Sequence, residues 1–82
     1  MRVTVRLFAV VAEAAGERTF SLDLPEGATA AAVRDAVADR FPRAAVACAR
    51  VALAVNATYA PPEQPLRDGD EVALIPPVSG GQ

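Results

Sequence analysis

Apolar and polar residues alternate along two stretches near the N-terminus. Over residues 2–8 the apolar positions are Val3, Val5 and Leu7, and over residues 19–24 they are Phe20, Leu22 and Leu24. A period of two indicates a strand with one buried face. Between these strands the alternation is lost from Phe8 to Val11, and residues 12–15 before Gly16 are typical of a short helical turn with a glycine stop. The pattern therefore predicts two strands joined by a short turn.

The apolar period changes in the middle of the chain. Val33, Val37 and Phe41 recur four residues apart, with Ala30 and Ala36 beside them, which predicts a helix over about residues 30–41 with one buried face. Thr29 occupies the expected N-cap position, and Pro42 ends the helix. Residues 43–50 fit either an irregular connection or another helical turn, and the pattern does not choose between them.

The remaining segments are short. We predict a third strand over 51–55, a turn at 56–59 into a short fourth piece, a tight turn at 66–70 and a final strand over 71–75. A first hairpin, a crossing helix and a closing strand that pairs parallel to the first strand define an α+β fold of the β-grasp, or ubiquitin-like, type. We expect a mixed sheet of four to five strands with one main helix on one face.

The sequence after residue 75 differs from the domain before it. We predict a β-grasp domain over 1–75 and an extended, flexible C-terminal tail over 76–82. Pro76 and Pro77 lack N–H groups and fix φ, so strand pairing stops there and the chain leaves in a stiff form. Gly80 and Gly81 have no Cβ and can enter a narrow slot. Residues 76–81 reach about 20 Å when extended, far enough to enter a partner's active site.

Composition limits the function further. The 82 residues are 52% apolar and carry a net charge of −2, which indicates one small domain. The eight basic residues are all arginine and are spread singly, so we expect no nucleic-acid partner. One cysteine, no signal core and no long apolar stretch favour a cytoplasmic protein that does not enter a membrane. Without histidine or lysine, the chain is poorly equipped to be an enzyme alone.

Several residues invite a functional and a structural interpretation. Cys48 lies among alanines and is more typical of a small buried residue than of a persulfide relay. Asp68, Asp70 and Glu71 suit a turn better than a cation site, so we predict no metal site. Phe8, Phe20 and Phe41 are expected in the core. The expected partner-binding residues lie at the start of the tail and just before it: Leu74, Ile75, Pro76, Pro77, Val78 and Ser79.

The C-terminal sixteen residues before Gln82 resemble a known signature. The stretch Asp-Gly-Asp-Glu-Val at 68–72, joined to Pro-Pro-Val-Ser-Gly-Gly at 76–81, is similar to the C-terminus of the sulfur-carrier family of molybdopterin synthase small subunits. Further matching segments are Leu7-Phe8-Ala9, Glu13-Ala14-Ala15-Gly16, residues 24–29 and Val55-Asn56, so the resemblance extends over nearly the whole chain. Carriers that serve thiazole formation resemble this fold but usually lack the diproline.

The resemblance implies a sulfur carrier whose reacting end is Gly80-Gly81. In that family an E1-like enzyme uses ATP to adenylate the carboxylate of the last glycine, here Gly81, and a sulfur donor protein converts it to a thiocarboxylate. The tail then enters the large subunit of molybdopterin synthase and donates sulfur to cyclic pyranopterin monophosphate in molybdenum cofactor biosynthesis. The resemblance thus implies that the chain is the sulfur-donating subunit of a two-subunit sulfurtransferase, that it binds no cofactor itself, and that its partner supplies the acid–base groups.

Gln82 departs from the family pattern because its amide bond occupies the carboxyl group of Gly81. Proteolytic trimming, an expression remnant and a drifted function would each explain it, and the sequence does not rank the first two. Two other functions stay open: a sulfur carrier for thiamin thiazole or cysteine synthesis, and a ubiquitin-like modifier of other proteins. A regulatory β-grasp domain would leave the glycine tail unexplained.

Overall fold

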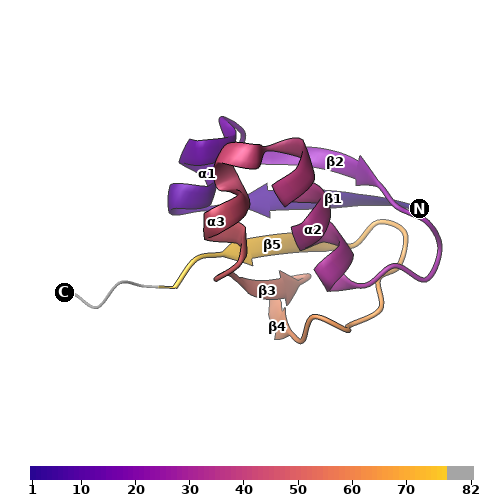
Figure 1. Ribbon diagram of the computed structural model, residues 1–82. Helices are drawn as coiled ribbons and strands as arrows, with labels where there is room; N and C mark the ends of the chain where they lie inside the picture. The colour runs from indigo at the N-terminus through magenta and orange to yellow at the C-terminus, as the bar shows by residue number, and fades with distance from the viewer. Residues whose placement is uncertain (78–82) are drawn as a thin grey trace.

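The computed structural model describes residues 1–77. In chain order the elements are β1 (Arg2–Leu7), α1 (Ala9–Ala15), β2 (Thr19–Asp23), α2 (Ala30–Arg40), the 3-10 helix η1 (Pro42–Ala44), α3 (Ala45–Cys48), β3 (Ala52–Val55), β4 (Thr58–Ala60) and β5 (Glu71–Ile75). The strands form one sheet in the order β2-β1-β5-β3-β4 (Figure 1). β1 and β5 are parallel, and the other neighbours are antiparallel. The expected β-grasp arrangement is confirmed.

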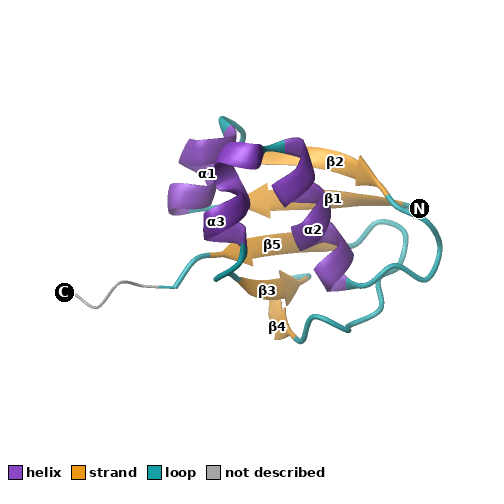
Figure 2. Ribbon diagram, viewed as in Figure 1, coloured by secondary structure: helices purple, strands orange, loops and turns teal. Residues whose placement is uncertain are grey.

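The helices lie on one face of the sheet (Figure 2). The core lies between these layers because each central strand points alternate side chains toward the helices. From the sheet the buried side chains include Val3, Val5, Leu7, Leu53, Val72 and Leu74, and from the helices they include Val11, Ala30, Val33, Val37, Ala44 and Cys48. The opposite face of the sheet is left without a covering layer by the described residues.

The main helix begins and ends close to the predicted positions. Thr29 is the N-cap residue with extended backbone, but its side chain makes no capping hydrogen bond. Instead, the N–H groups of Ala30 and Ala31 donate to the carbonyl oxygens of Gln64 and Pro62, both at 2.9 Å. The loop after β4 therefore supplies acceptors that a helix start otherwise lacks.

The region left open by the sequence is helical. Residues 42–48 form η1 and α3, and both contribute a fully buried side chain, Ala44 and Cys48, to the core. The short helix before Gly16 is confirmed but begins earlier than expected, at Ala9. Gly16 ends it with φ +76°, and its N–H donates to the carbonyl oxygen of Ala12 at 2.8 Å.

The aromatic residues are less buried than predicted. The core assignment of Phe8 is wrong, because β1 ends at Leu7 and the chain turns at Ala9, where φ is +49°, leaving the Phe8 side chain 40% exposed. Phe20 and Phe41 are partly buried at the margin of the core, where their rings meet edge to face with centroids 5.5 Å apart. Aromatic rings commonly pack in this way.

Candidate functional site

The site is built around β5, the strand that precedes the tail. β5 pairs with β1 on one side and β3 on the other, with Leu74 opposite both Leu7 and Leu53. Val72 and Leu74 have no exposed surface. A central strand with two ladders and a buried face is among the last parts of a domain to open. The tail is therefore anchored on one of the most firmly held segments of the fold.

The start of β5 is fixed by a compact hydrogen-bonded turn. Asp70 accepts hydrogen bonds from the Arg67 N–H at 2.8 Å and from the Asn56 amide at 3.0 Å. These bonds, with that of Arg67 first, hold the pKa of the Asp70 carboxyl below its ordinary value. Asn56 also accepts from the Glu71 N–H at 3.0 Å, and its own N–H donates to the Glu71 carbonyl oxygen at 2.8 Å. The prediction of a turn at Asp68-Gly69-Asp70 is confirmed.

The end of β5 lies beside the end of β1. Because the two strands are parallel and Leu7 is opposite Leu74, Phe8 and Ile75 lie at the same end of the sheet. On the other side Ala52 is opposite Ile75. Ile75 and Pro76 are partly buried, whereas Pro77 is exposed. We call Arg6, Phe8, Ile75, Pro76 and Pro77 the exit surface, because they surround the point where the chain leaves the sheet.

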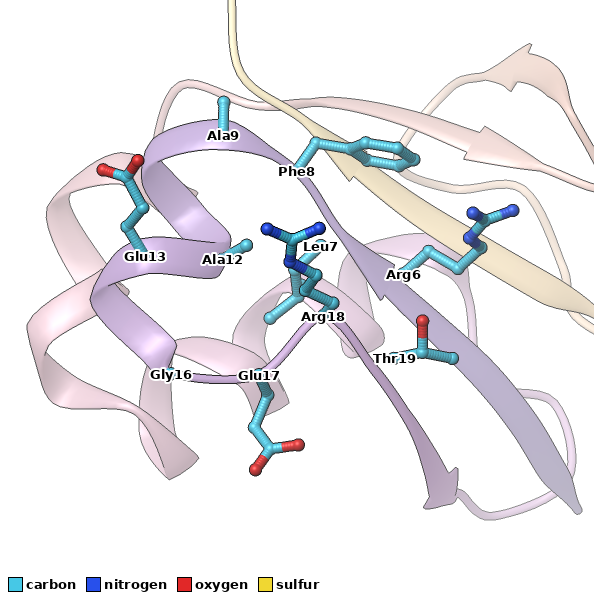
Figure 3. Close-up of a pocket in the computed structure, with 10 residues that line it drawn as sticks. All are labelled: Arg6, Leu7, Phe8, Ala9, Ala12, Glu13, Gly16, Glu17, Arg18 and Thr19. Carbon is cyan, nitrogen blue, oxygen red and sulfur yellow. The ribbon is translucent and has the colours of Figure 1, made fainter.

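Arg6 adds charge to the exit surface. Its guanidinium lies 3.8 Å from the Glu71 carboxylate and 5.6 Å from the centre of the Phe8 ring. Figure 3 shows the Arg6 and Phe8 side chains beside one another, on the side of β1 that faces β5. Both members of the Arg6–Glu71 pair are nearly half exposed, so the pair contributes little to stability. Its charges remain available to a partner, while the Phe8 ring offers apolar area.

A hollow of about 540 Å³ adjoins this surface (Figure 3). It is lined by β1, α1 and the connection to β2, with Arg6 and Phe8 from β1 and its end, Glu13 from α1, and Glu17 and Arg18 from the connection. Charges of both signs therefore lie around an apolar ring. A surface of this kind suits side chains of a protein partner better than a small apolar ligand.

The predicted partner-binding residues differ in how deeply the structure buries them. Leu74 is fully buried, which corrects the expectation that its side chain contacts a partner. Its neighbour Ile75 faces the opposite side of the sheet and is partly exposed, as is Pro76, while Pro77 is exposed. The predictions for Val78, Ser79, Gly80 and Gly81 fall outside the described residues and stay predictions.

Two residues of the exit surface were missed by the sequence reasoning. Arg6 was assigned only to the polar face of its strand, and Phe8 was assigned to the core. The loss of alternation immediately after Leu7 was the available signal, because it marks the point where side chains stop following the two faces of a sheet. The sequence could not predict that Arg6 lies close to Glu71, because that contact depends on the register between β1 and β5.

The other candidates are accounted for by packing and turn geometry. Cys48 is buried with 1% of its surface exposed, and burial raises the pKa of its thiol, so it is a poor nucleophile in this setting. Within residues 1–77, histidine, cysteine and acidic side chains do not form a cluster of three or more suited to a metal ion. The described helices are also all too short or too polar to cross a membrane.

Comparison with known proteins identifies the family. Residues 5–81 match the model of the ThiS family, so the chain belongs to that family. It is 38% identical over 82 residues to the molybdopterin synthase sulfur carrier subunit of Mycobacterium tuberculosis, covering 99% of each chain. The resemblance proposed from the sequence is thus confirmed.

Solved structures agree with the fold. The small archaeal modifier protein SAMP1 of Haloferax volcanii matches with a TM-score of 0.85 and 31% identity, over 99% of this chain and 100% of the other. Subunits 1 and 2 of the molybdopterin-converting factor of Helicobacter pylori were solved as a complex, and a chain of it matches with a TM-score of 0.71 and 27% identity, over 99% and 100% of the two chains.

Proposed function

We propose that this protein is the sulfur-carrier subunit of a molybdopterin synthase and that the carboxyl group of Gly81 carries the sulfur. The observation on which the proposal rests most directly is the position of β5. A fully paired central strand leads directly into Pro76 and Pro77, and the sequence then ends in Ser-Gly-Gly before Gln82. The names of full-length relatives at 33–39% identity support the same function.

The chemistry requires only a free glycine carboxylate from this chain. A carboxylate is a poor electrophile, so an activating E1-like enzyme first joins it to AMP from ATP, with release of pyrophosphate. Sulfur at the oxidation level of hydrosulfide, supplied by a donor protein, then forms a bond to the acyl carbon, and AMP leaves. The resulting thiocarboxylate is a soft nucleophile that can donate its sulfur to cyclic pyranopterin monophosphate. Acid–base groups come from the partners, since the chain has no histidine.

The proposed partner in the second stage is a molybdopterin synthase large subunit. The complex of the two Helicobacter pylori subunits supports this assignment. In our proposal the large subunit receives the tail and covers the exit surface, whose Phe8 ring and Ile75 side chain supply apolar contact beside the Arg6 and Glu71 charges. An aromatic residue within a partly charged surround is typical of residues that dominate protein interfaces.

Gln82 determines which form of the chain is active. Because its amide bond occupies the Gly81 carboxyl group, we expect the form that ends at Gly81 to accept sulfur and the form that ends at Gln82 not to. The test is intact mass spectrometry after incubation with the activating enzyme, ATP and a sulfur donor. The Gly81 form should gain the mass of an oxygen-to-sulfur exchange, and the same gain in the Gln82 form, without loss of glutamine, would refute the assignment of Gly81.

A second candidate is a protein modifier, because SAMP1 is a close structural match. A modifier would form an amide with lysine side chains of other proteins, while this lysine-free chain could not form lysine-linked chains with itself. Lysine-dependent conjugates in a cell extract would favour this function. A carrier for thiamin thiazole or cysteine synthesis would accept sulfur but would form no stable complex with the molybdopterin synthase large subunit.

A further inference from the structure

The two edges of the sheet differ in how they are protected. β4 has only three residues and runs directly into Pro61 and Pro62, which lack N–H groups and discourage further pairing. β2, at the opposite edge, has five residues, Thr-Phe-Ser-Leu-Asp, with no proline. An edge without these features is a template on which another strand can pair.

The register of β2 on β1 shows which of its backbone groups point outward. The Leu24 N–H donates to the Met1 carbonyl oxygen and the Leu7 N–H donates to the Arg18 carbonyl oxygen, each at 2.8 Å. Residues at even positions of β2 therefore direct their backbone groups to β1, and the intervening Thr19, Ser21 and Asp23 direct theirs away from it. Among the described residues, these outward N–H groups find no hydrogen-bond acceptor.

The core is incompletely covered along this edge. Phe20, Leu22 and Leu24 point toward the helices but remain partly exposed, in contrast to the fully buried side chains of β1. Phe41 lies against Phe20 and is also partly exposed. The side chains of an added strand would alternate like those of β2, so every second one would lie over this apolar margin.

Arg40 gives one end of the edge a positive charge. Its guanidinium carbon lies 4.8 Å from the centre of the Phe20 ring and 5.3 Å from that of Phe41. Within residues 1–77 it forms no ion pair. Arg40 and Arg43 both line a second hollow, of about 330 Å³, and Glu13 lies across it on α1. The edge thus combines unpaired backbone groups, apolar area and an arginine held in place by two rings.

We propose that the β2 edge binds an extended segment of a partner protein as a sixth strand, and that this segment carries alternating apolar side chains and a carboxylate beside Arg40. Backbone pairing with Thr19, Ser21 and Asp23 would supply the register. A second copy of this chain fits less well. Paired antiparallel about Ser21, it would place Leu22 and Leu24 on the helix side next to Phe20 and no carboxylate near Arg40.

The probe is a short blocked peptide in which valine and threonine alternate and the last two residues are glutamate. An antiparallel peptide brings its C-terminal end to the start of β2, where Arg40 lies. A matched peptide ends in lysine instead. Amide NMR spectra of the full chain should show shifts and slowed hydrogen exchange at Thr19, Ser21 and Asp23 on addition of the glutamate peptide. We expect the lysine peptide to bind about tenfold more weakly.

Two variants separate the backbone from the charge. Ser21→Pro removes an outward N–H without removing a bond to β1 and should abolish binding. Arg40→Ala should weaken the glutamate peptide about fivefold, because one partly exposed charge pair is lost. Arg50→Ala, which removes a charge away from β2, should leave binding unchanged.

Each measurement has a contrary result. Equal binding of both peptides, an unchanged affinity in Arg40→Ala, or shifts that centre on β4 would overturn the proposal. Dimerisation of the chain alone, with the same three amides protected, would assign the edge to a second copy instead. Thermal unfolding of each variant checks folding, and the Arg40→Ala result decides the matter if Ser21→Pro does not fold. The outcome is independent of sulfur transfer.

Discussion

Leu74 and Ile75 are adjacent in the chain, yet the structure predicts that Leu74 stabilises the core and that Ile75 contacts a partner. Leu74 has no exposed surface and lies opposite Leu7 and Leu53, which are 3% and 4% exposed. Leu74→Ala removes buried atoms and leaves a cavity, which costs about 2–5 kcal/mol. For a domain of this size that corresponds to a fall in melting temperature of roughly 10–30 °C. Much of the total stability of a small domain would be lost.

Ile75→Ala is the matched control because it removes a partly exposed side chain of similar size from the same strand. We expect a cost of about 1 kcal/mol or less in the free energy of unfolding. Its main effect should be on the proposed interface, where loss of an anchoring side chain weakens binding to the large subunit about tenfold. Leu74→Ala, measured under conditions in which it is folded, should keep that affinity within about threefold.

The assay is urea unfolding followed by circular dichroism, paired with calorimetric titration of the large subunit. Both use the form ending at Gly81. The reasoning is refuted if Leu74→Ala loses less than about 1 kcal/mol of unfolding free energy, or if it weakens the partner more than Ile75→Ala does. The first result would mean that the Leu74 side chain does not stabilise the core, and the second would mean that it contacts the partner after all.

Three further predictions concern the acid limb, the turns and the thiol. The pKa of the Asp70 carboxyl is lowered from about 3.8 in the folded chain, so its contribution to the free energy of unfolding is present above that pH and is lost as the pH falls through the lowered value. Asp70→Asn should therefore flatten the acid side of a plot of unfolding free energy against pH. An unchanged plot would contradict this. Ala57 has φ +69° and Gly69 has φ +89°, a left-handed backbone conformation that favours glycine. In urea unfolding, Ala57→Gly should stabilise the chain by up to about 1 kcal/mol, and Gly69→Ala should destabilise it by about 1–2 kcal/mol. The reverse order would count against the turn assignments. In the form that ends at Gly81, Cys48→Ala should accept sulfur as well as the chain that keeps Cys48, and loss of sulfur acceptance would establish a relay. The Cys48 thiol should react with a thiol reagent slowly until the protein unfolds.

The fold was predictable because most of its strands have one buried face. Alternation located β1 and β2, and the four-residue recurrence of Val33 and Val37 located α2. β5 is different, because its residues from Val72 to Ile75 are all apolar although only alternate ones are fully buried. A central strand with an apolar residue at nearly every position carries no period from which to assign faces. For this reason the sequence did not show that Leu74 points into the core, and Leu74 was predicted to bind a partner together with Ile75.

The assignment of the reacting end to Gly80-Gly81 stays a prediction, and the surroundings of the exit surface could not be predicted from the sequence. The diproline and the Gly-Gly pair are local signals, and their chemistry follows from the residue types. The position of Phe8 depends on the turn at Ala9, and the contact of Arg6 with Glu71 depends on the register of two strands far apart in sequence. The same holds for the start of α2, whose N–H groups bond to a loop more than thirty residues later. Such contacts arise only when the chain folds.

The central claim is that sulfur is carried on Gly81 and delivered through a large subunit. Its most direct test follows the intact mass of the Gly81 form in two stages. Incubation with the activating enzyme, ATP and a sulfur donor should add the mass of an oxygen-to-sulfur exchange. Addition of the large subunit with cyclic pyranopterin monophosphate should then remove it, while either one alone should not. Retention of the sulfur with both present, or a gain of sulfur away from Gly81, would contradict the account.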